Sequence, residues 1–377
     1  MPWNESNRMS LRRDFLALCE QPGVNISELC RRFEISRKTG YKWLARGKEA
    51  LADQSRRPHS SPERTPAKIE AVILATRDQY RDWGARKLKR YLENKGRRDL
   101  PSVSTITQIL HRHGRITPDA SQAAQPWQRF EHPEPNHLWQ MDYKGHVAMT
   151  QGRVHPLTVL DDHSRFNLVL AACARESMQE VQAALIACFR RYGLPHRISC
   201  DNGSPWGNTR GEVGLTHLGV WITRLGIRLT HARPGHPQTN GKDERFHRTL
   251  KSGVLQRQVF TDLANAQRAF DAFRDVYNHE RPHQALDLDV PISRYRPSQR
   301  PYPEVLPQPE YESGSTVRKV SKNGLIHFNG RRYRIAKALD GQQVAIMPDA
   351  DNDALYTVYF FQTAVRKLDL RLDDFID

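Results

Sequence analysis

The chain has 377 residues, more than one average domain, so we expect two to four domains. Lys and Arg number 58 against 42 Asp and Glu, which gives a net charge of +16 and favours a polyanionic partner such as DNA. A basic ribosomal or membrane-surface protein would share this charge. No apolar run is long enough to span a bilayer and the N-terminus lacks a signal-peptide core, so we expect a cytoplasmic protein with no membrane partner.

The five cysteines are scattered, odd in number and form no CxxC pair. This pattern indicates neither a disulfide framework nor a cysteine zinc site. We therefore expect buried free thiols in a reducing compartment, at Cys19, Cys30, Cys173, Cys188 and Cys200.

Residues 1–51 predict short helices with a sharp break between them. Ser36 is placed to cap a helix that carries the basic residues Arg37, Lys38 and Lys42. Two helices with a short turn and a basic second helix fit a helix-turn-helix domain, whose second helix enters the major groove. An ordinary helical hairpin with a solvated basic face fits this segment equally well.

Residues 52–66 are rich in Pro, Ser and Arg and cannot bury a core, so we expect an extended linker. Arg56 and Arg57 are candidate minor-groove contacts within it, although a plainly solvated linker is the simpler interpretation. Residues 67–116 then carry apolar stripes at helical spacing and predict a second helical, helix-turn-helix-like module. A second recognition helix could start near Pro101, with candidate DNA contacts at Ser104, Thr105 and Gln108.

After a connector at 117–133, the periodicity of residues 134–295 changes to strands followed by alternating helices and strands. This order predicts a mixed sheet flanked by helices. The expected strands are 139–147, 154–160, 166–172, 196–200 and 228–232, and the expected helices are 178–192, 216–225, one from Asp243 onward and 260–279. A proline-rich linker at 296–316 leads to a tail, 317–377, of short alternating segments with a hairpin signal at Asn329-Gly330, for which we expect a small β-barrel.

Three acidic residues fall where a divalent cation could use them. Asp142 and Asp201 sit at or just past the ends of apolar strand-like runs, and Glu244 opens an amphipathic helix after a loop rich in Pro, Gly and Asn. Mg²⁺ prefers oxygen ligands, usually carboxylates together with substrate phosphates. Two such ions can clamp the attacking and leaving oxygens of an in-line phosphoryl displacement.

This Asp, Asp, Glu set closely resembles the catalytic core of retroviral-integrase-type transposases. The surrounding segments HPQTNGKDERFHRTLK and YNHERPHQAL resemble bacterial insertion-sequence transposases with that core, and the resemblance extends along nearly the whole chain. It implies a multidomain α+β protein with a ribonuclease-H-like catalytic domain. It also implies that Asp142, Asp201 and Glu244 are catalytic and hold two Mg²⁺ (or Mn²⁺) ions. The His/Cys zinc module found at the N-terminus of retroviral integrases is absent here.

The resemblance further implies a transposase that binds the terminal inverted repeats of an insertion sequence in double-stranded DNA. It would hydrolyse the phosphodiester at the element ends and join the 3′-hydroxyl ends to target DNA by two-metal transesterification. Joining two ends requires at least a dimer on DNA, and the enzyme is expected at the nucleoid. Arg248 and Lys251 share a helical face with Glu244 and are expected to grip phosphates, the alternative being a solvated Glu–Arg ion pair.

Other acidic residues compete for the metal site. Asp161 and Asp162 are expected to form the turn between the second and third strands. Neighbours on a helix point about 100° apart, so only one of Asp243 and Glu244 should face the sheet, and the resemblance gives Glu244 the family's position. Histidines near these segments, such as His247, are expected to be solvated or hydrogen-bonded. Two other functional classes stay open: a domesticated sequence-specific DNA-binding regulator without cleavage activity, and a sequence-independent ribonuclease-H-type nuclease.

Overall fold

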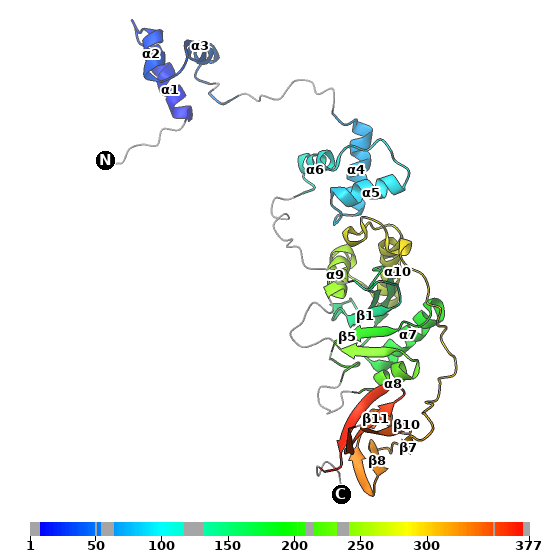
Figure 1. The fold of residues 1–377 in the computed structure, drawn as a ribbon. Coiled ribbons are helices and arrows are strands. Elements are labelled where there is room, and N and C mark those ends of the chain that lie inside the picture. The colour runs from blue at the N-terminus through cyan, green and yellow to red at the C-terminus, as the bar shows by residue number, and fades with distance from the viewer. Residues whose placement is uncertain are drawn as a thin grey trace. The chain divides into compact units, whose positions relative to one another are not determined.

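The computed structural model describes residues 8–49, 51–53, 64–116, 131–201, 203–207, 215–231, 241–349 and 351–371. The chain forms two compact units, Met1–Arg64 and Thr65–Asp377. The first unit is helical. The second unit contains a further helical module, a mixed sheet with its helices and a C-terminal β region (Figure 1).

The helices of the first unit are α1 (Arg8–Cys19), α2 (Ile26–Arg32) and α3 (Arg37–Arg46). Asn25 caps α2 by accepting from the backbone of Ser27, and Ser36 caps α3 by accepting from that of Thr39 at 3.1 Å, as its sequence predicts. A Cβ on Gly40 would collide with the Sγ of Cys30, so glycine lets α3 approach α2 closely.

The second unit starts with another three-helix module, made of α4 (Ala67–Gln79), α5 (Ala85–Asn94) and α6 (Val103–Arg112). Its centre is closed by Ile73, Leu88 and Ile106, each with 0% exposure. Ser102 caps α6 by accepting from the Thr105 backbone at 3.2 Å, so the expected helix start near Pro101 is confirmed.

The mixed sheet follows the expected strands-first order. Its strands are β1 (Leu138–Tyr143), β2 (Val147–Ala148), β3 (Arg153–Asp161), β4 (Asn167–Cys173), β5 (Arg197–Cys200) and β6 (Arg228–His231). Strand β3 pairs antiparallel with β4 and β1, and β1, β5 and β6 run parallel. The strand expected at 139–147 is divided, because the chain turns at Gly145, whose φ is +81°, before β2 begins.

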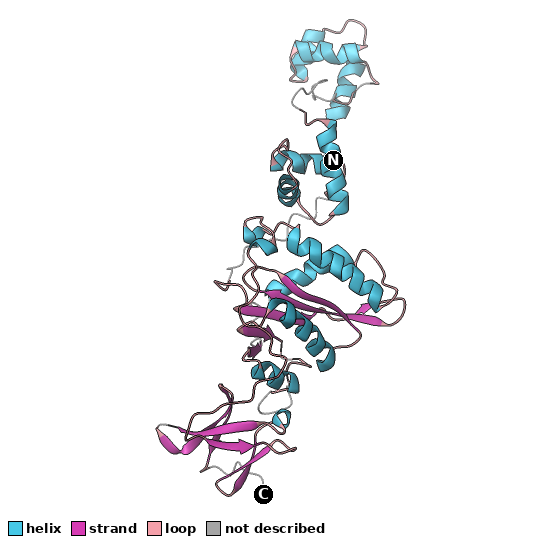
Figure 2. Ribbon diagram, turned by 90° about the vertical axis from the view of Figure 1, so that its right-hand side faces the viewer, coloured by secondary structure: helices cyan, strands magenta, loops and turns pink. Residues whose placement is uncertain are grey.

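Helices cover both faces of this sheet (Figure 2). Trp139 and Met141 of β1 pack on the side of α7 (Met178–Tyr192) and α8 (His217–Arg224). Because side chains alternate along a strand, Gln140 and Asp142 point to the opposite face, where α9 (Gly241–Leu250) and α10 (Leu263–His279) lie. The Asp142 side chain therefore meets α9.

Helix α10 begins three residues later than its periodicity suggests. Asp262 accepts from the backbone N–H of Asn265 at 2.8 Å and caps the helix, so Leu263 is its first residue. Phe260, expected as the helix start, is instead fully buried in a bridge to Met149. A π-helical turn, η3 (Lys251–Leu255), follows α9, and two short 3₁₀ turns, η4 (Gln284–Leu286) and η5 (Pro291–Ser293), follow α10.

The proline-rich segment after η5 is packed along the core. The backbone N–H of Ser298 donates to the Tyr192 carbonyl, and the Arg300 carbonyl accepts from Leu194, both at 2.8 Å. The Arg300 guanidinium also donates to the Pro195 carbonyl at 2.6 Å. Backbone pairing with the end of α7 thus fixes a segment whose composition predicts an extended linker.

The C-terminal region forms open sheets, so the expectation of a small β-barrel is wrong for its described residues. One sheet has the order β12 (Thr363–Asp369), β11 (Asn352–Phe360), β10 (Gln343–Asp349) and β7 (Thr316–Lys319). A separate hairpin joins β8 (Leu325–Phe328) and β9 (Arg331–Arg334) through the predicted turn at Asn329-Gly330, and η6 (Lys337–Leu339) follows. The apolar residues Ile326 and Tyr333 of the hairpin share one core with Ile346 and Val358 of the sheet. The hairpin thus covers that core without closing the sheet's edges.

All five cysteines are free, and four of them are buried, Cys19 being partly exposed. In the described ranges, no helix is both long enough and apolar enough to cross a membrane.

Candidate active site

Asp142 and Asp201 lie at the ends of neighbouring parallel strands. In the β1–β5 pairing Gln140 stands opposite Ser199, so two residues further along each strand the chain reaches Asp142 and Asp201. Burial, and next the charge of Asp201, raises the pKa of Asp142 to about 7. A divalent cation bound between these two carboxylates at the sheet edge would relieve the repulsion between them.

Helix α9 presents two adjacent acidic residues to different surroundings. Asp243 is 1% exposed, whereas Glu244 is exposed. The Thr158 hydroxyl donates to the Asp243 carboxylate at 3.1 Å, and the Asp243 backbone N–H donates to the Gln140 side chain at 3.2 Å. Asp243 therefore fastens α9 to β1 and β3, and Glu244 is the acidic residue of α9 that meets solvent.

His247 joins Asp243 to Asp142 beneath the surface. Its Nδ1 lies 3.9 Å from Asp142 Oδ2 and its Nε2 lies 3.7 Å from Asp243 Oδ2. Within the described part of the chain, Asp142, Asp243 and His247 offer ligand atoms within 4.8 Å of one another. His247 is 7% exposed, so it is not solvated, although it is hydrogen-bonded to Thr158 at 2.9 Å.

The surroundings of this buried group favour uncharged side chains. Burial, and next the charge of Asp142, raises the pKa of Asp243 well above its ordinary value. Burial, with a smaller effect of Lys144, lowers the pKa of His247 to about 3. Asp243 and His247 are both hydrogen-bonded to Thr158, so they form a buried polar layer beneath Asp142.

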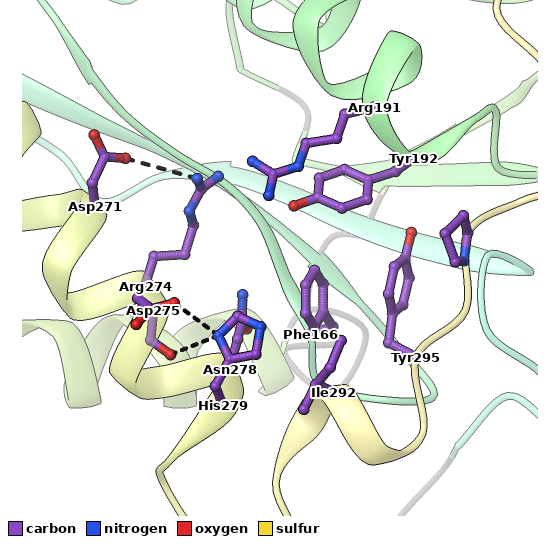
Figure 3. A pocket seen from close by; sticks show the side chains of 11 residues that line it. Phe166, Arg191, Tyr192, Asp271, Arg274, Asp275, Asn278, His279, Ile292 and Tyr295 are labelled. Atoms are coloured by element: carbon purple, nitrogen blue, oxygen red, sulfur yellow. Dashed lines mark hydrogen bonds and ion pairs between the residues drawn. The ribbon is translucent and has the colours of Figure 1, made fainter.

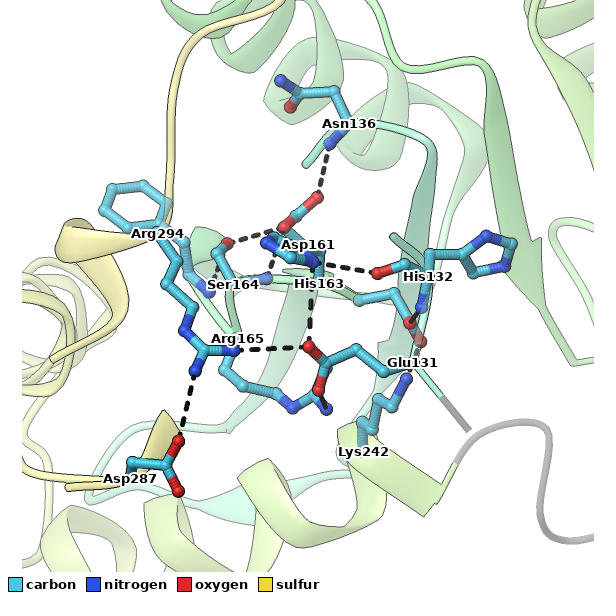
Figure 4. Close-up of polar contacts among 12 residues, drawn as sticks. Glu131, His132, Asn136, Asp161, His163, Ser164, Arg165, Lys242, Asp287 and Arg294 are labelled. Atoms are coloured by element: carbon cyan, nitrogen blue, oxygen red, sulfur yellow. Dashed lines mark hydrogen bonds and ion pairs between the residues drawn. The ribbon is translucent and has the colours of Figure 1, made fainter. Parts of the chain in front are cut away.

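The acidic turn between β3 and β4 anchors the start of α9 (Figure 4). Lys242 forms an ion pair with Asp162, whose carboxylate also accepts from the Gln140 side chain at 2.9 Å. Asp161 accepts from the backbone of Asn136 at 2.7 Å. Asp162 is therefore a turn residue, as predicted, whereas Asp161 is the last residue of β3. Both carboxylates already have partners inside the protein.

Arg248 and Lys251 are exposed, as is Glu244. Among the described residues no ion pair joins Glu244 to Arg248, so the solvated Glu–Arg pair is not observed. Lys251 opens the π-helical turn η3, and such turns occur frequently at functional sites. These two cations are free to contact a ligand beside Glu244.

The candidate DNA contacts of the helical modules differ in accessibility. Arg37, Lys38 and Lys42 are exposed on α3, opposite the buried Gly40 and Trp43. Arg56 and Arg57 lie outside the described residues. On α6, Ser104 and Gln108 are exposed and Thr105 is half-buried. The hydroxyls of Ser104 and Thr105 each lie 2.8 Å from that of the capping Ser102.

Gln140 and Thr158 are site residues that sequence reasoning did not single out, and His247 was noted but given no role in the site. Their side chains meet only because β1, β3 and α9 pack together. One signal was available, since His247 follows Asp243 by four residues and therefore shares its helical face. The other two carry no local signal.

A cavity of about 320 Å³ lies elsewhere, between the end of α7, α10 and η5 (Figure 3). Several of its polar groups are paired inside the protein. Arg274 donates to the Leu168 carbonyl at 3.1 Å and lies 3.8 Å from Asp271, and His279 lies 2.9 Å from Asp275. None of the three candidate catalytic carboxylates lines this cavity.

The fold and the paired carboxylates define an integrase-type core preceded by DNA-binding helical modules. The family model "Integrase core domain" matches residues 132–237, and a second model of that description matches 225–291. "Helix-turn-helix domain" matches 12–59 and "Homeodomain-like domain" matches 37–110. "IS481 family transposase, C-terminal domain" matches 315–374.

Similar proteins agree with these domains. A 31.7 kDa protein of insertion element IS407 from Burkholderia multivorans is 30% identical over 42% of this chain and 54% of its own length. A 39.2 kDa protein of IS476 from Xanthomonas euvesicatoria is 31% identical over 44% and 46%, so the chain spans about half the length of these two relatives. The transposase of IS904 from Lactococcus lactis is 23% identical over 59% and 90%.

Among solved structures, the magnesium complex of the HTLV-2 integrase catalytic core in its trimeric form matches at 15% identity and a TM-score of 0.34. This match covers 44% of this chain and 99% of that one. By its family models and the named relatives, the chain is similar to bacterial insertion-sequence transposases of the integrase superfamily.

Proposed function

We propose that this protein binds the terminal inverted repeats of an insertion sequence, hydrolyses the phosphodiester at each element end and joins the 3′-hydroxyl ends to target DNA. Asp142, Asp201 and Glu244 are its catalytic carboxylates. Double-stranded DNA is its partner at the nucleoid, and at least two copies of the chain assemble when two ends are joined.

One observation carries the proposal. Asp142 and Asp201 end neighbouring parallel strands, and Asp142 faces the helix that carries Glu244. The raised pKa of Asp142, due to burial and then to Asp201, marks a site with more negative charge than the protein alone neutralises. Exposed Glu244 is accessible to a DNA phosphate, whereas Asp243 is not.

The donor set suits a hard divalent cation, because it offers carboxylate oxygens at an accessible sheet edge. Asp142, Asp201 and Glu244 would hold two Mg²⁺ (or Mn²⁺) ions. When bound, the ions would activate a water or the 3′-hydroxyl of DNA as the nucleophile and would neutralise charge at the scissile phosphate.

The protein's remaining contribution is positioning. The position of α9 on the sheet is fixed by the contacts of Asp243 and His247 with Thr158. The ion pair of Lys242 with Asp162 fixes the first turn of α9. The exposed cations Arg248 and Lys251 hold the phosphates on either side of the reacting bond. Holding the substrate in line in this way accelerates phosphoryl transfer without any proton transfer by a side chain.

The test incubates the full chain with DNA that carries the element ends, target DNA and Mg²⁺. We expect joined products, and we expect Asp142→Asn, Asp201→Asn and Glu244→Gln each to reduce joining to background while end binding is retained. The amides keep the shape of the carboxyl groups and remove the charge that holds the metals. Asp271→Asn, at an exposed acid 54% accessible on α10, is the matched control and should join normally.

Other outcomes would assign other functions. Specific binding to the ends without any cleavage would indicate the domesticated regulator, and unspecific degradation of DNA would indicate a ribonuclease-H-type nuclease. Near-normal joining by any one of the three carboxylate variants would remove that residue from the site.

A further inference from the structure

Ion pairs attach the helical module α4–α6 to the core where the chain returns after α10. Asp82, between α4 and α5, accepts from the Arg281 guanidinium at 2.7 Å and from Arg257 at 3.3 Å. Tyr80 donates to the Glu280 carboxylate at 3.0 Å. Arg281 is only 7% exposed, whereas Asp82 and Glu280 are half-buried and Arg257 is exposed.

Positive charge exceeds negative charge at this junction. Lys87, on the first turn of α5, is electrostatically coupled to Arg281 and to Arg245 of α9, and Asp82 is the carboxylate coupled to it. Burial, then Arg281, lowers the pKa of Lys87 to about 7 despite the opposing effect of Asp82. Asp82 is already shared by Arg281 and Arg257, so it does not neutralise Lys87 as well.

Two polar groups at this junction lack a partner. The Lys87 side chain makes no hydrogen bond or salt bridge within the described ranges. The Nε2 of His283 is buried and also has no hydrogen-bond partner there. Burial, and next the charges of Arg281 and Lys87, lowers the pKa of His283, so its ring lies close to the same cations.

Buried cations without a counter-ion are costly, and an anion that reached them would be bound strongly. Arg245 is exposed, and it follows Glu244 directly on α9. A ligand approaching from the side of Arg245 would therefore stand beside the candidate catalytic helix. A single phosphate group fits such a site, because it accepts several charge-assisted hydrogen bonds at once.

We propose that Lys87, Arg245 and Arg281 bind one backbone phosphate of duplex DNA where the α4–α6 module meets the catalytic core. This proposal rests on the proposed function, which supplies DNA as the polyanion. One part of the DNA would be bound by the helical modules and another part would reach Glu244. The phosphate contact would hold the DNA strand between these two parts. A phosphate contact positions DNA without reading its sequence.

The test measures binding of the full chain to an end-containing duplex and to a random duplex over a range of salt concentrations, without divalent metal. Lys87→Gln should lower the slope of log affinity against log salt by about one on both duplexes. Arg245→Gln, at an exposed position, should do the same. Lys89→Gln is the matched control, because Lys89 is on the same helix and lies 3.9 Å from Glu93, a partner that Lys87 lacks.

A thermal melt separates a ligand site from a structural one. Lys87→Gln should leave the melting temperature of the free protein unchanged or raise it, because it removes an uncompensated charge. If Lys87→Gln and Arg245→Gln both showed the same slope of log affinity against log salt as the control Lys89→Gln, the proposal would be overturned. A second outcome would also overturn the proposal. If inorganic phosphate stabilised the wild-type protein but not Lys87→Gln, and Lys87→Gln kept the full salt slope on DNA, the site would bind free phosphate rather than DNA.

Failure of the proposed function would look different. A protein that joins no ends but loses salt slope in Lys87→Gln would retain this phosphate site. If the protein joined ends normally while Lys87→Gln and Arg245→Gln kept the full salt slope, only the proposed phosphate site would be overturned.

Discussion

At the scale of residues, the adjacent acids Asp243 and Glu244 show how one helical step decides a role. Neighbours on a helix point about 100° apart, so one faces the sheet and the other does not. Here Asp243 is 1% exposed and hydrogen-bonded to Thr158, whereas Glu244 is exposed. The environment of each residue therefore separates a support for α9 from a candidate metal ligand.

We expect Asp243→Asn to keep strand joining and to cost about 1 kcal/mol or less of unfolding free energy, because the amide retains hydrogen bonding in a site that already resists ionisation. Asp243→Ala should cost about 1–3 kcal/mol, because the Thr158 hydroxyl then loses the buried carboxylate to which it donates. Urea denaturation and the joining assay measure both effects. Loss of joining in a well-folded Asp243→Asn protein would instead favour Asp142, Asp243 and His247 as the metal ligands.

The pKa of Asp142 predicts a pH dependence. Because burial and Asp201 raise it from 3.8 to about 7, the folded protein binds a proton there that the unfolded chain releases above about pH 4. The contribution of Asp142 to stability of the metal-free protein should therefore fall as pH rises from about 4 to 7. Below pH 7 a metal ion must displace this proton. The apparent affinity of the protein for the metal should therefore fall by about tenfold for each unit by which the pH is lowered.

Thermal melts with and without Mg²⁺ at several pH values check this prediction. Stabilisation by Mg²⁺ should be larger at pH 8 than at pH 6, and Asp142→Asn should remove the difference. Equal stabilisation at both pH values in the wild-type protein would show that Asp142 does not compete with a proton for the metal.

At the scale of elements, α9 owes its position to contacts at both of its ends. Lys242 and Asp243 hold its first turn, and the π-helical turn η3 continues it toward α10. A Cβ on Gly253 in η3 would lie 2.6 Å from the ring of Phe273, so only glycine lets this turn approach α10 so closely. Lys251 is displayed at the start of the same turn.

Gly253→Ala should therefore destabilise the protein by about 1–3 kcal/mol, because the added methyl group overpacks the contact with Phe273. Gly241→Ala is the control, since nothing lies within 4 Å of a Cβ there, and it should be neutral or stabilising by up to about 1 kcal/mol. Denaturant unfolding of both variants measures the difference. Equal stabilities would mean that η3 shifts to accept the methyl group without cost.

At the scale of the whole molecule, the α4–α6 module belongs to the second compact unit rather than to the first. Val276 of α10 packs against its apolar core, and Arg281 pairs with Asp82. The module nevertheless has a closed centre of its own, which includes Ile73 and Leu88 at 0% exposure. It should therefore fold without the core, at a lower stability than in the full chain.

A fragment of residues 1–114 should accordingly fold and bind the inverted repeat specifically. Arg37→Ala should weaken binding to the cognate sequence by about 1–3 kcal/mol and leave binding to random DNA unchanged, because a base-reading contact is lost. Fluorescence anisotropy with the two duplexes measures both affinities. An equal loss on random DNA would reassign Arg37 to a phosphate contact.

The sequence by itself determined the features that depend on neighbouring residues. The caps Ser36 and Ser102, the turn at Asn329-Gly330 and the strands-first order of the core follow from local hydrogen bonding and periodicity, which act over a few residues. The same patterns put Asp142 and Asp201 at strand ends, where parallel pairing brings them to one edge.

Only the tertiary structure decided the features that depend on burial between distant segments. It showed that Asp243 rather than Glu244 faces the sheet and that the C-terminal sheets stay open. It also brought Lys87 close to Arg281, which pairs with Asp82 from 199 residues away. The physical reason is the same in each case: removal from water raises the cost of charge and of unpaired polar groups, and which groups lose their water depends on how the elements pack.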